Sequence, residues 1–178
     1  MAAQPVSVTV SENPSLTDNP ILDFFLAYWG AKRGSRAMPS RADIVPAQLK
    51  EHLGWLCFIE ALPEYNDFRF RLICSRVAEY FLADATGLTV REAYGAAKAG
   101  RAATEAVLWI LRKTCAARVP MRVTGGGGEW RGHFYPDYDA LYLPLSEDGA
   151  AANMVMCSFT FNYQAYLQTR ALSAMTKR

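Results

Sequence analysis

The stretch WLCFIEALPEYNDFRFRL, residues 55–72, decides the fold of this chain. Residues 55–62 are apolar and rich in strand-forming types, and residues 68–72 alternate between apolar and basic side chains, the pattern of a half-buried strand. Proline, asparagine and aspartate between them favour a turn. The stretch therefore predicts a β-hairpin.

A helix is predicted upstream of this hairpin. Asp18 or Asn19 can cap it, Pro20 suits its first position, and Gly34 supplies a stop after residues 21–33. Large apolar side chains recur on it at helical spacing. They include Ile21, Leu22, Phe25, Leu26 and Trp29. A stripe this wide must pack on its own sheet or on a second protomer.

Helices and then strands are predicted downstream. Helical spacing marks residues 75–82 and 99–117, and three strands follow at 118–124, 138–145 and 153–163. The glycines of residues 125–128 are read as a turn between strands, because the GK[ST] ending of a phosphate-binding loop is missing. Strands and helices grouped in this way indicate an α+β fold with an antiparallel sheet.

The 178 residues suit one domain with short flanking segments. We expect a flexible tail at 1–17, flanking helices with a connecting loop at 18–54, and a core at 55–163. Residues 164–178 are expected to form a tail or a short helix.

Composition excludes several classes of function. A net charge of +2 predicts no nucleic-acid partner, and neither a signal peptide nor a membrane span is present. The four cysteines form no CxxC pair, so no metal site is predicted and a cytoplasmic location follows. With two histidines and no nucleophile motif, we expect no enzyme.

Three motifs carry a family resemblance: MPSRADIVP at residues 38–46, the FRL strand with Thr86-Gly87 beyond it, and YLPLS at 142–146 with Asp148-Gly149. With them the chain resembles the PAS superfamily, and most closely its small stand-alone bacterial proteins. The resemblance implies a five-stranded antiparallel sheet with helices on one face and an N-terminal flanking helix. The motif residues are interpreted as structural: Met38, Pro39, Arg41, Asp43, Pro46, Arg71 and Pro144.

The charged motif residues leave two interpretations open. Arg41 and Asp43 either bind an anion or a partner, or hold their loop by hydrogen bonds to its backbone and to each other, which is the favoured interpretation. By strand alternation, Arg71 faces away from Phe70 and Leu72 and meets Asp43 or the leading helix.

The resemblance implies a sensor that binds a small apolar ligand or a protein partner and acts in trans, because no output domain is attached. A pocket is expected between the inner sheet face and the middle helices. Its expected lining is Phe70, Leu72, Tyr80, Phe81, Val107, Leu111, Leu143 and Phe159. A closed core of the same residues is an equal alternative. Neither heme nor flavin is predicted.

The resemblance also implies a homodimer formed through the leading helix. Two other functions stay open: a small cone-shaped α+β enzyme with a polar pocket, and a purely structural dimerisation module.

Overall fold

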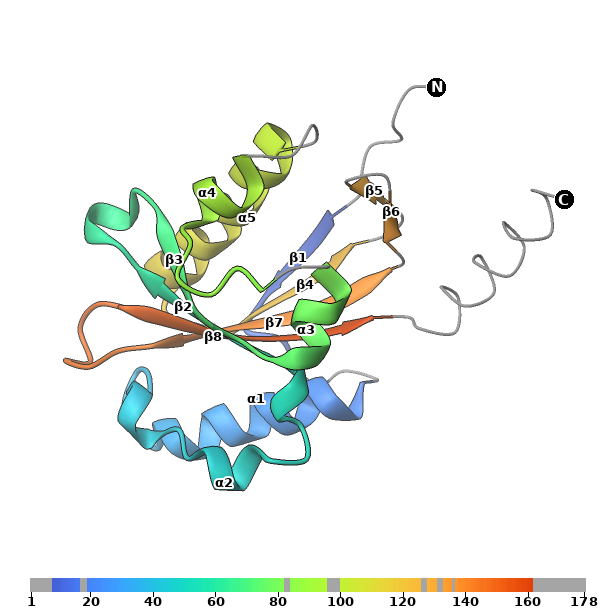
Figure 1. Cartoon of the computed structure of the whole chain (residues 1–178). Coiled ribbons are helices and arrows are strands. Elements are labelled where there is room, and N and C mark those ends of the chain that lie inside the picture. The colour runs from blue at the N-terminus through green and yellow to red at the C-terminus, as the bar shows by residue number, and fades with distance from the viewer. Residues whose placement is uncertain are drawn as a thin grey trace, which may run out of the picture.

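An antiparallel sheet organises the computed structural model, which describes residues 8–16, 19–81, 84–95, 100–125, 128–130, 133–135 and 137–161 (Figure 1). Within these residues its six strands follow the order β1-β4-β7-β8-β2-β3. Their bounds are β1 Val8–Glu12, β4 Met121–Gly125, β7 Tyr138–Leu145, β8 Met154–Phe161, β2 Leu56–Ala61 and β3 Phe68–Ile73. The predicted hairpin is β2 and β3, and the α+β class is confirmed.

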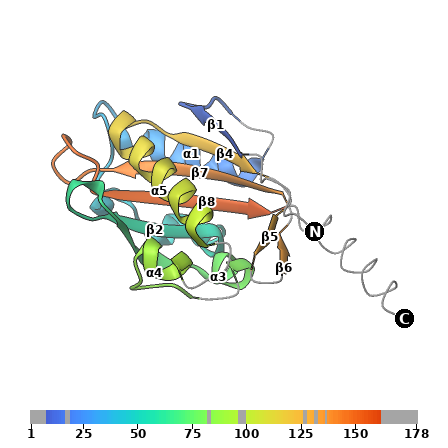
Figure 2. The same cartoon turned by 90° about the horizontal axis from the view of Figure 1, so that it is seen from above.

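Helices cover both faces of this sheet (Figure 1). On one face lie α1 (Pro20–Arg33) and α2 (Pro46–Leu49), with the 3-10 turns Arg41–Asp43 and Leu53–Trp55 beside them. On the other lie α4 (Val90–Gly95) and α5 (Gly100–Ala117), and α5 crosses β7 and β8 (Figure 2). The short helix α3 (Ser75–Phe81) follows β3. None of the described helices is long and apolar enough to cross a bilayer.

Strand β1 corrects the expectation of five strands and of a tail over residues 1–17. It pairs with the edge of β4, with Val10 opposite Val123, and the Asn13 N–H donates to the Pro120 carbonyl at 2.7 Å. Its sequence VTVSE is short and mostly exposed, with only its central valine half-buried. Backbone pairing with an open sheet edge explains its position, and a weak apolar pattern cannot reveal that pairing.

The predicted glycine turn is only partly described. Gly125 ends β4, and β5 (Gly128–Trp130) pairs with β6 (His133–Tyr135) in a separate small hairpin, while residues 126–127 lie outside the described residues. The helix expected within 164–178 lies outside them too.

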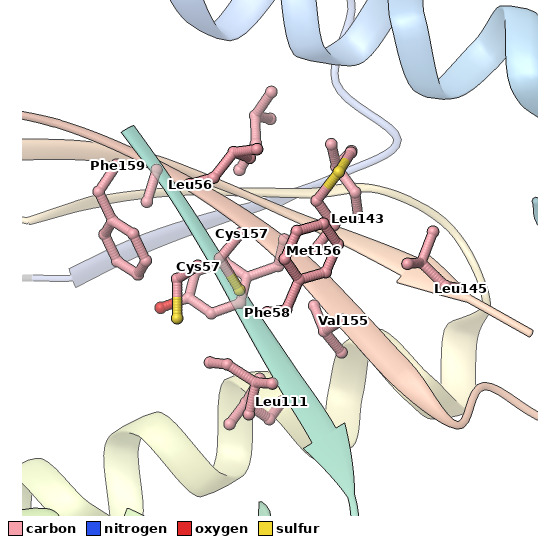
Figure 3. Close-up of a cluster of buried hydrophobic side chains, with 14 of the residues drawn as sticks. Leu56, Cys57, Phe58, Leu111, Leu143, Leu145, Val155, Met156, Cys157 and Phe159 are labelled. Atoms are coloured by element: carbon pink, nitrogen blue, oxygen red, sulfur yellow. The ribbon is translucent and has the colours of Figure 1, made fainter. Parts of the chain in front are cut away.

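Both faces of the sheet are apolar. Leu143 and Met156 point toward α1, whereas Cys157 and Phe159 point to the side where Leu111 of α5 packs (Figure 3). Their adjacent positions in β7 and β8 follow the two-residue alternation of strands. The sheet is therefore the middle layer of three.

A β-bulge interrupts this alternation in β3. Ile59 pairs with Phe70 and Phe58 pairs with Leu72, so Arg71 is an extra residue in β3. Beyond the bulge, Ile73 is buried and Leu72 is 40% exposed. The expectation that Phe70 and Leu72 share one face is therefore wrong.

Helix α1 packs on the sheet of its own chain. Asn19 caps it, accepting from the N–H groups of Ile21 and Leu22, and its side-chain amide donates to Thr160 Oγ1 at 2.6 Å. Three stripe residues are buried in the core: Leu22, Phe25 and Trp29. These three cannot form the dimer contact that the sequence suggested while α1 stays in place, whereas Ile21 and Leu26 are half-buried.

Candidate functional site

A cavity of about 100 Å³ lies against the sheet face that α5 covers. Strand residues form one wall: Cys57, Ile59, Phe70, Ile73, Tyr142 and Phe159. Helices and the α3–α4 connection supply the others: Val77, Asp84, Ala85, Leu88, Ala93, Tyr94 and Val107. The wall is mostly aliphatic and aromatic, so water inside it gains few hydrogen bonds.

Three residues of the predicted lining lie in this wall, namely Phe70, Val107 and Phe159. Leu72 is turned away by the bulge, Leu143 packs toward α1, and Leu111 is buried in the core beyond the wall. Tyr80 and Phe81 belong to α3, and their side chains lie outside the described part of the structure.

The lining that the sequence analysis missed comes mainly from strand register. Ile73 takes the inward position because of the bulge at Arg71. Tyr142 lies between Leu141 and Leu143 in β7 and so faces the opposite side of the sheet from them. The prediction that Leu143 lines the pocket therefore placed Tyr142 on the wrong face. Because both faces of β7 are buried, hydrophobicity alone does not identify the cavity face.

Tyr142 is the buried polar group of the cavity wall. It is 4% exposed, and its ring packs edge-on against Phe159 with 5.8 Å between ring centroids. Burial is the main cause that raises the pKa of its hydroxyl well above the ordinary value, so it stays protonated. No residue in the described part of the chain hydrogen-bonds to this hydroxyl.

Cys57 also lines the cavity, directly opposite Cys157 in the β2–β8 pairing. Burial raises the pKa of both thiols, and it raises the pKa of Cys115 to about 12. The thiolate is the reactive form of cysteine, so these protonated thiols behave as small apolar groups. All four cysteines are free.

Asp84 is the charged group of the wall. It is exposed, and hydrogen bonds from the Thr86 side chain and backbone N–H lower the pKa of its carboxyl. No arginine, lysine or histidine occurs among the described lining residues. An anionic ligand would therefore meet a carboxylate without a compensating cation.

The MPSRADIVP motif forms a tied loop on the opposite face. Asp43 accepts hydrogen bonds from Ser40 N–H at 2.7 Å, from Ser40 Oγ at 3.0 Å and from Arg36 at 2.8 Å. Arg41 donates to the Ile44 carbonyl at 3.3 Å and stacks over Phe58, 4.5 Å from its ring centroid. Both residues therefore hold the loop, although they do not pair with each other.

The remaining motif residues connect this loop to the sheet. Met38 is buried, the Pro39 carbonyl accepts from Ser146 N–H at 2.9 Å, and Pro46 begins α2. The Pro144 carbonyl accepts a hydrogen bond from the Trp29 indole N–H at 2.8 Å. The ion pair of Arg71 is with Glu60, at 3.8 Å, so the suggested pairing with Asp43 is wrong.

No three histidine, cysteine, aspartate or glutamate side chains in the described ranges gather as a metal site requires. His52 packs against Phe24, with 4.5 Å between ring centroids.

Comparison with known proteins gives one family. The family model described as PAS domain matches residues 18–157, which is most of the chain and includes the motif loop, α1 and most of the sheet. Searches of curated proteins and of solved structures found no match. The chain therefore belongs to the PAS domain family.

Proposed function

We propose that this PAS domain binds a small, predominantly apolar molecule in the cavity under α5 and passes the signal to a protein partner in trans. Family membership indicates a sensor- or signalling-type domain. The observation that carries the proposal is the apolar cavity between the sheet and the middle helices. A wall of this chemistry favours an apolar occupant over water.

The volume sets the size of the ligand. A cavity of about 150 Å³ engineered in another protein holds benzene. The cavity here measures about 100 Å³, and exposed Asp84 and Leu88 lie on its wall. A molecule of one ring or a short alkyl chain fits such a space when part of it reaches the exposed side.

We propose further that the domain has no catalytic activity of its own. Catalysis in this cavity would need a base or a nucleophile poised near neutral pH. Cys57 is protonated because burial raises the pKa of its thiol, and the Asp84 carboxylate has no histidine or lysine beside it in the described wall. The cone-shaped enzyme alternative would need a buried Asp–His or Tyr–Asp pair, and the described lining residues include no histidine and only the exposed Asp84 as a carboxylate.

An NMR titration with toluene tests the ligand proposal. Toluene is expected to shift the backbone amide signals of Ile59, Ile73 and Val107 in a saturable way. Val107→Phe puts a larger side chain into the cavity and should abolish these shifts. Val45→Phe makes the same replacement at a 39% exposed position away from the wall, so binding should persist.

Native mass spectrometry of the purified protein, beside a denatured control, complements the titration. A retained small molecule would support the proposal and give the mass of its ligand. Toluene shifts that do not saturate, or that survive Val107→Phe, would contradict cavity binding and favour a module that works through protein contacts alone.

A further inference from the structure

The Tyr142 hydroxyl gives the cavity a specific hydrogen-bonding chemistry. We infer that the cavity selects an uncharged one-ring molecule whose hydrogen-bond acceptor, such as a carbonyl, nitrile or ring nitrogen, receives the O–H of Tyr142. This inference rests on the proposed ligand-binding function and adds the class of ligand and the residue that recognises it.

Thr114 and Tyr65 show how other hydroxyls in the described part of the chain are paired within the protein. Thr114 Oγ1 donates to the Ile110 carbonyl at 2.8 Å, and the Tyr65 hydroxyl donates to the Ala152 carbonyl at 3.0 Å. Tyr142 lies on the cavity wall, 4% exposed, and no described residue bonds to its hydroxyl. A ligand acceptor that reaches this hydroxyl makes a hydrogen bond that no described residue makes, and so gains affinity.

The hydroxyl acts as a donor. Burial keeps the Tyr142 phenol protonated at neutral pH, and a protonated phenol offers one O–H to an acceptor. Phe159 presents a ring to this donor and Cys57 presents a thiol, which is a weak acceptor. The phenol of Tyr94 is the other hydroxyl of the described wall.

The charge of the wall selects against anions. Asp84 is a carboxylate of lowered pKa, and no cation occurs among the described lining residues. An acid that is ionised at neutral pH would lose hydration without gaining a counter-charge. The favoured ligand is therefore a neutral ring with one acceptor.

Benzonitrile and phenylacetylene form the test pair, because they match in shape and differ in the acceptor nitrogen. We expect wild-type protein to bind benzonitrile about three- to tenfold more tightly in NMR titrations, the ratio that one net hydrogen bond supplies. The infrared nitrile stretch of bound benzonitrile should also show the shift to higher frequency that hydrogen bonding causes.

Tyr142→Phe removes the hydroxyl and keeps the ring against Phe159. It should abolish both the preference for benzonitrile and the nitrile shift, while phenylacetylene affinity stays within about twofold of wild type. Tyr65→Phe is the matched control, because its hydroxyl bonds to Ala152 away from the cavity. It should keep the preference although it loses stability.

The outcomes separate the two proposals. Equal binding of the pair by wild type, or a preference and a nitrile shift that survive Tyr142→Phe, would overturn the role of Tyr142 and leave the ligand cavity standing. Failure of both compounds to bind would overturn the cavity proposal, and the acceptor selectivity with it.

Discussion

At the scale of a single residue, Asp43 holds the motif loop of residues 38–46 in place. Its carboxylate accepts two bonds from Ser40 and one from Arg36, and the backbone bond from Ser40 is the largest cause of its lowered pKa. The loop must cross from α1 to α2, and these bonds satisfy polar groups that are otherwise free. These hydrogen bonds of Asp43 therefore hold the motif loop in place.

This arrangement predicts a pH-dependent effect of Asp43→Asn. The folded-state pKa of Asp43 lies below its ordinary value of 3.8, so its ionised form stabilises the fold above that value and the contribution is lost as pH falls through the lowered pKa. Asp43→Asn should lower the urea midpoint at pH 7, and the difference from wild type should shrink toward about pH 3.

Glu51→Gln is the control for this series. Glu51 is exposed and makes no bond or ion pair with any described residue, so its replacement should leave the midpoint unchanged at both pH values. A deficit of Asp43→Asn that is equal at pH 7 and pH 3 would show that shape, and not charge, explains the effect.

At the scale of elements, helical spacing and strand alternation predicted α1, α5, β2, β3, β7 and β8 close to their observed bounds. The helical signals are strong because α1 and α5 each bury one face, and the central strands β7 and β8 are marked by long apolar runs that are buried on both faces. The cavity wall was harder to predict. Placing Leu72 required knowledge of the bulge at Arg71, and choosing between Leu143 and Tyr142 required knowing which helix covers which sheet face.

Strand β1 was missed for a related reason, because its stability comes from its partner. Its main contacts are the backbone pairing with β4, the half-buried Val10, and an ion pair between Glu12 and Lys113 of α5. None of these contacts is visible in the sequence VTVSE by itself.

Deletion of residues 1–12 should therefore destabilise the domain. The unfolding free energy is expected to fall by about 1–2 kcal/mol, from partial loss of valine burial and of strand hydrogen bonds. The free edge of β4 should also promote self-association. Deletion of residues 1–7 alone retains β1 and is the matched control. Equal urea midpoints and equal masses by light scattering for both deletions would contradict a stabilising role for β1.

At the scale of the whole molecule, the sheet is covered on both faces within one chain (Figure 1). Leu22, Phe25 and Trp29 of the apolar stripe on α1 are buried against the sheet of their own chain, so their burial does not require a second protomer. Homodimerisation stays a prediction from the family resemblance, and the three buried stripe residues are not available to it. Ala27 and Ala31 are one turn apart on the exposed side of α1, and Trp109 is 53% exposed on α5.

We expect a homodimer at micromolar concentration that uses the exposed side of α1, where small side chains allow close approach of a second chain. Ala27→Glu/Ala31→Glu should convert it to monomer in light scattering, because four carboxylates would meet across the interface while helix propensity changes little. Trp109→Glu places a charge on the opposite layer and should leave the dimer intact. A monomeric wild type would refute the dimer. Loss of the dimer in Trp109→Glu alone would move the interface to α5.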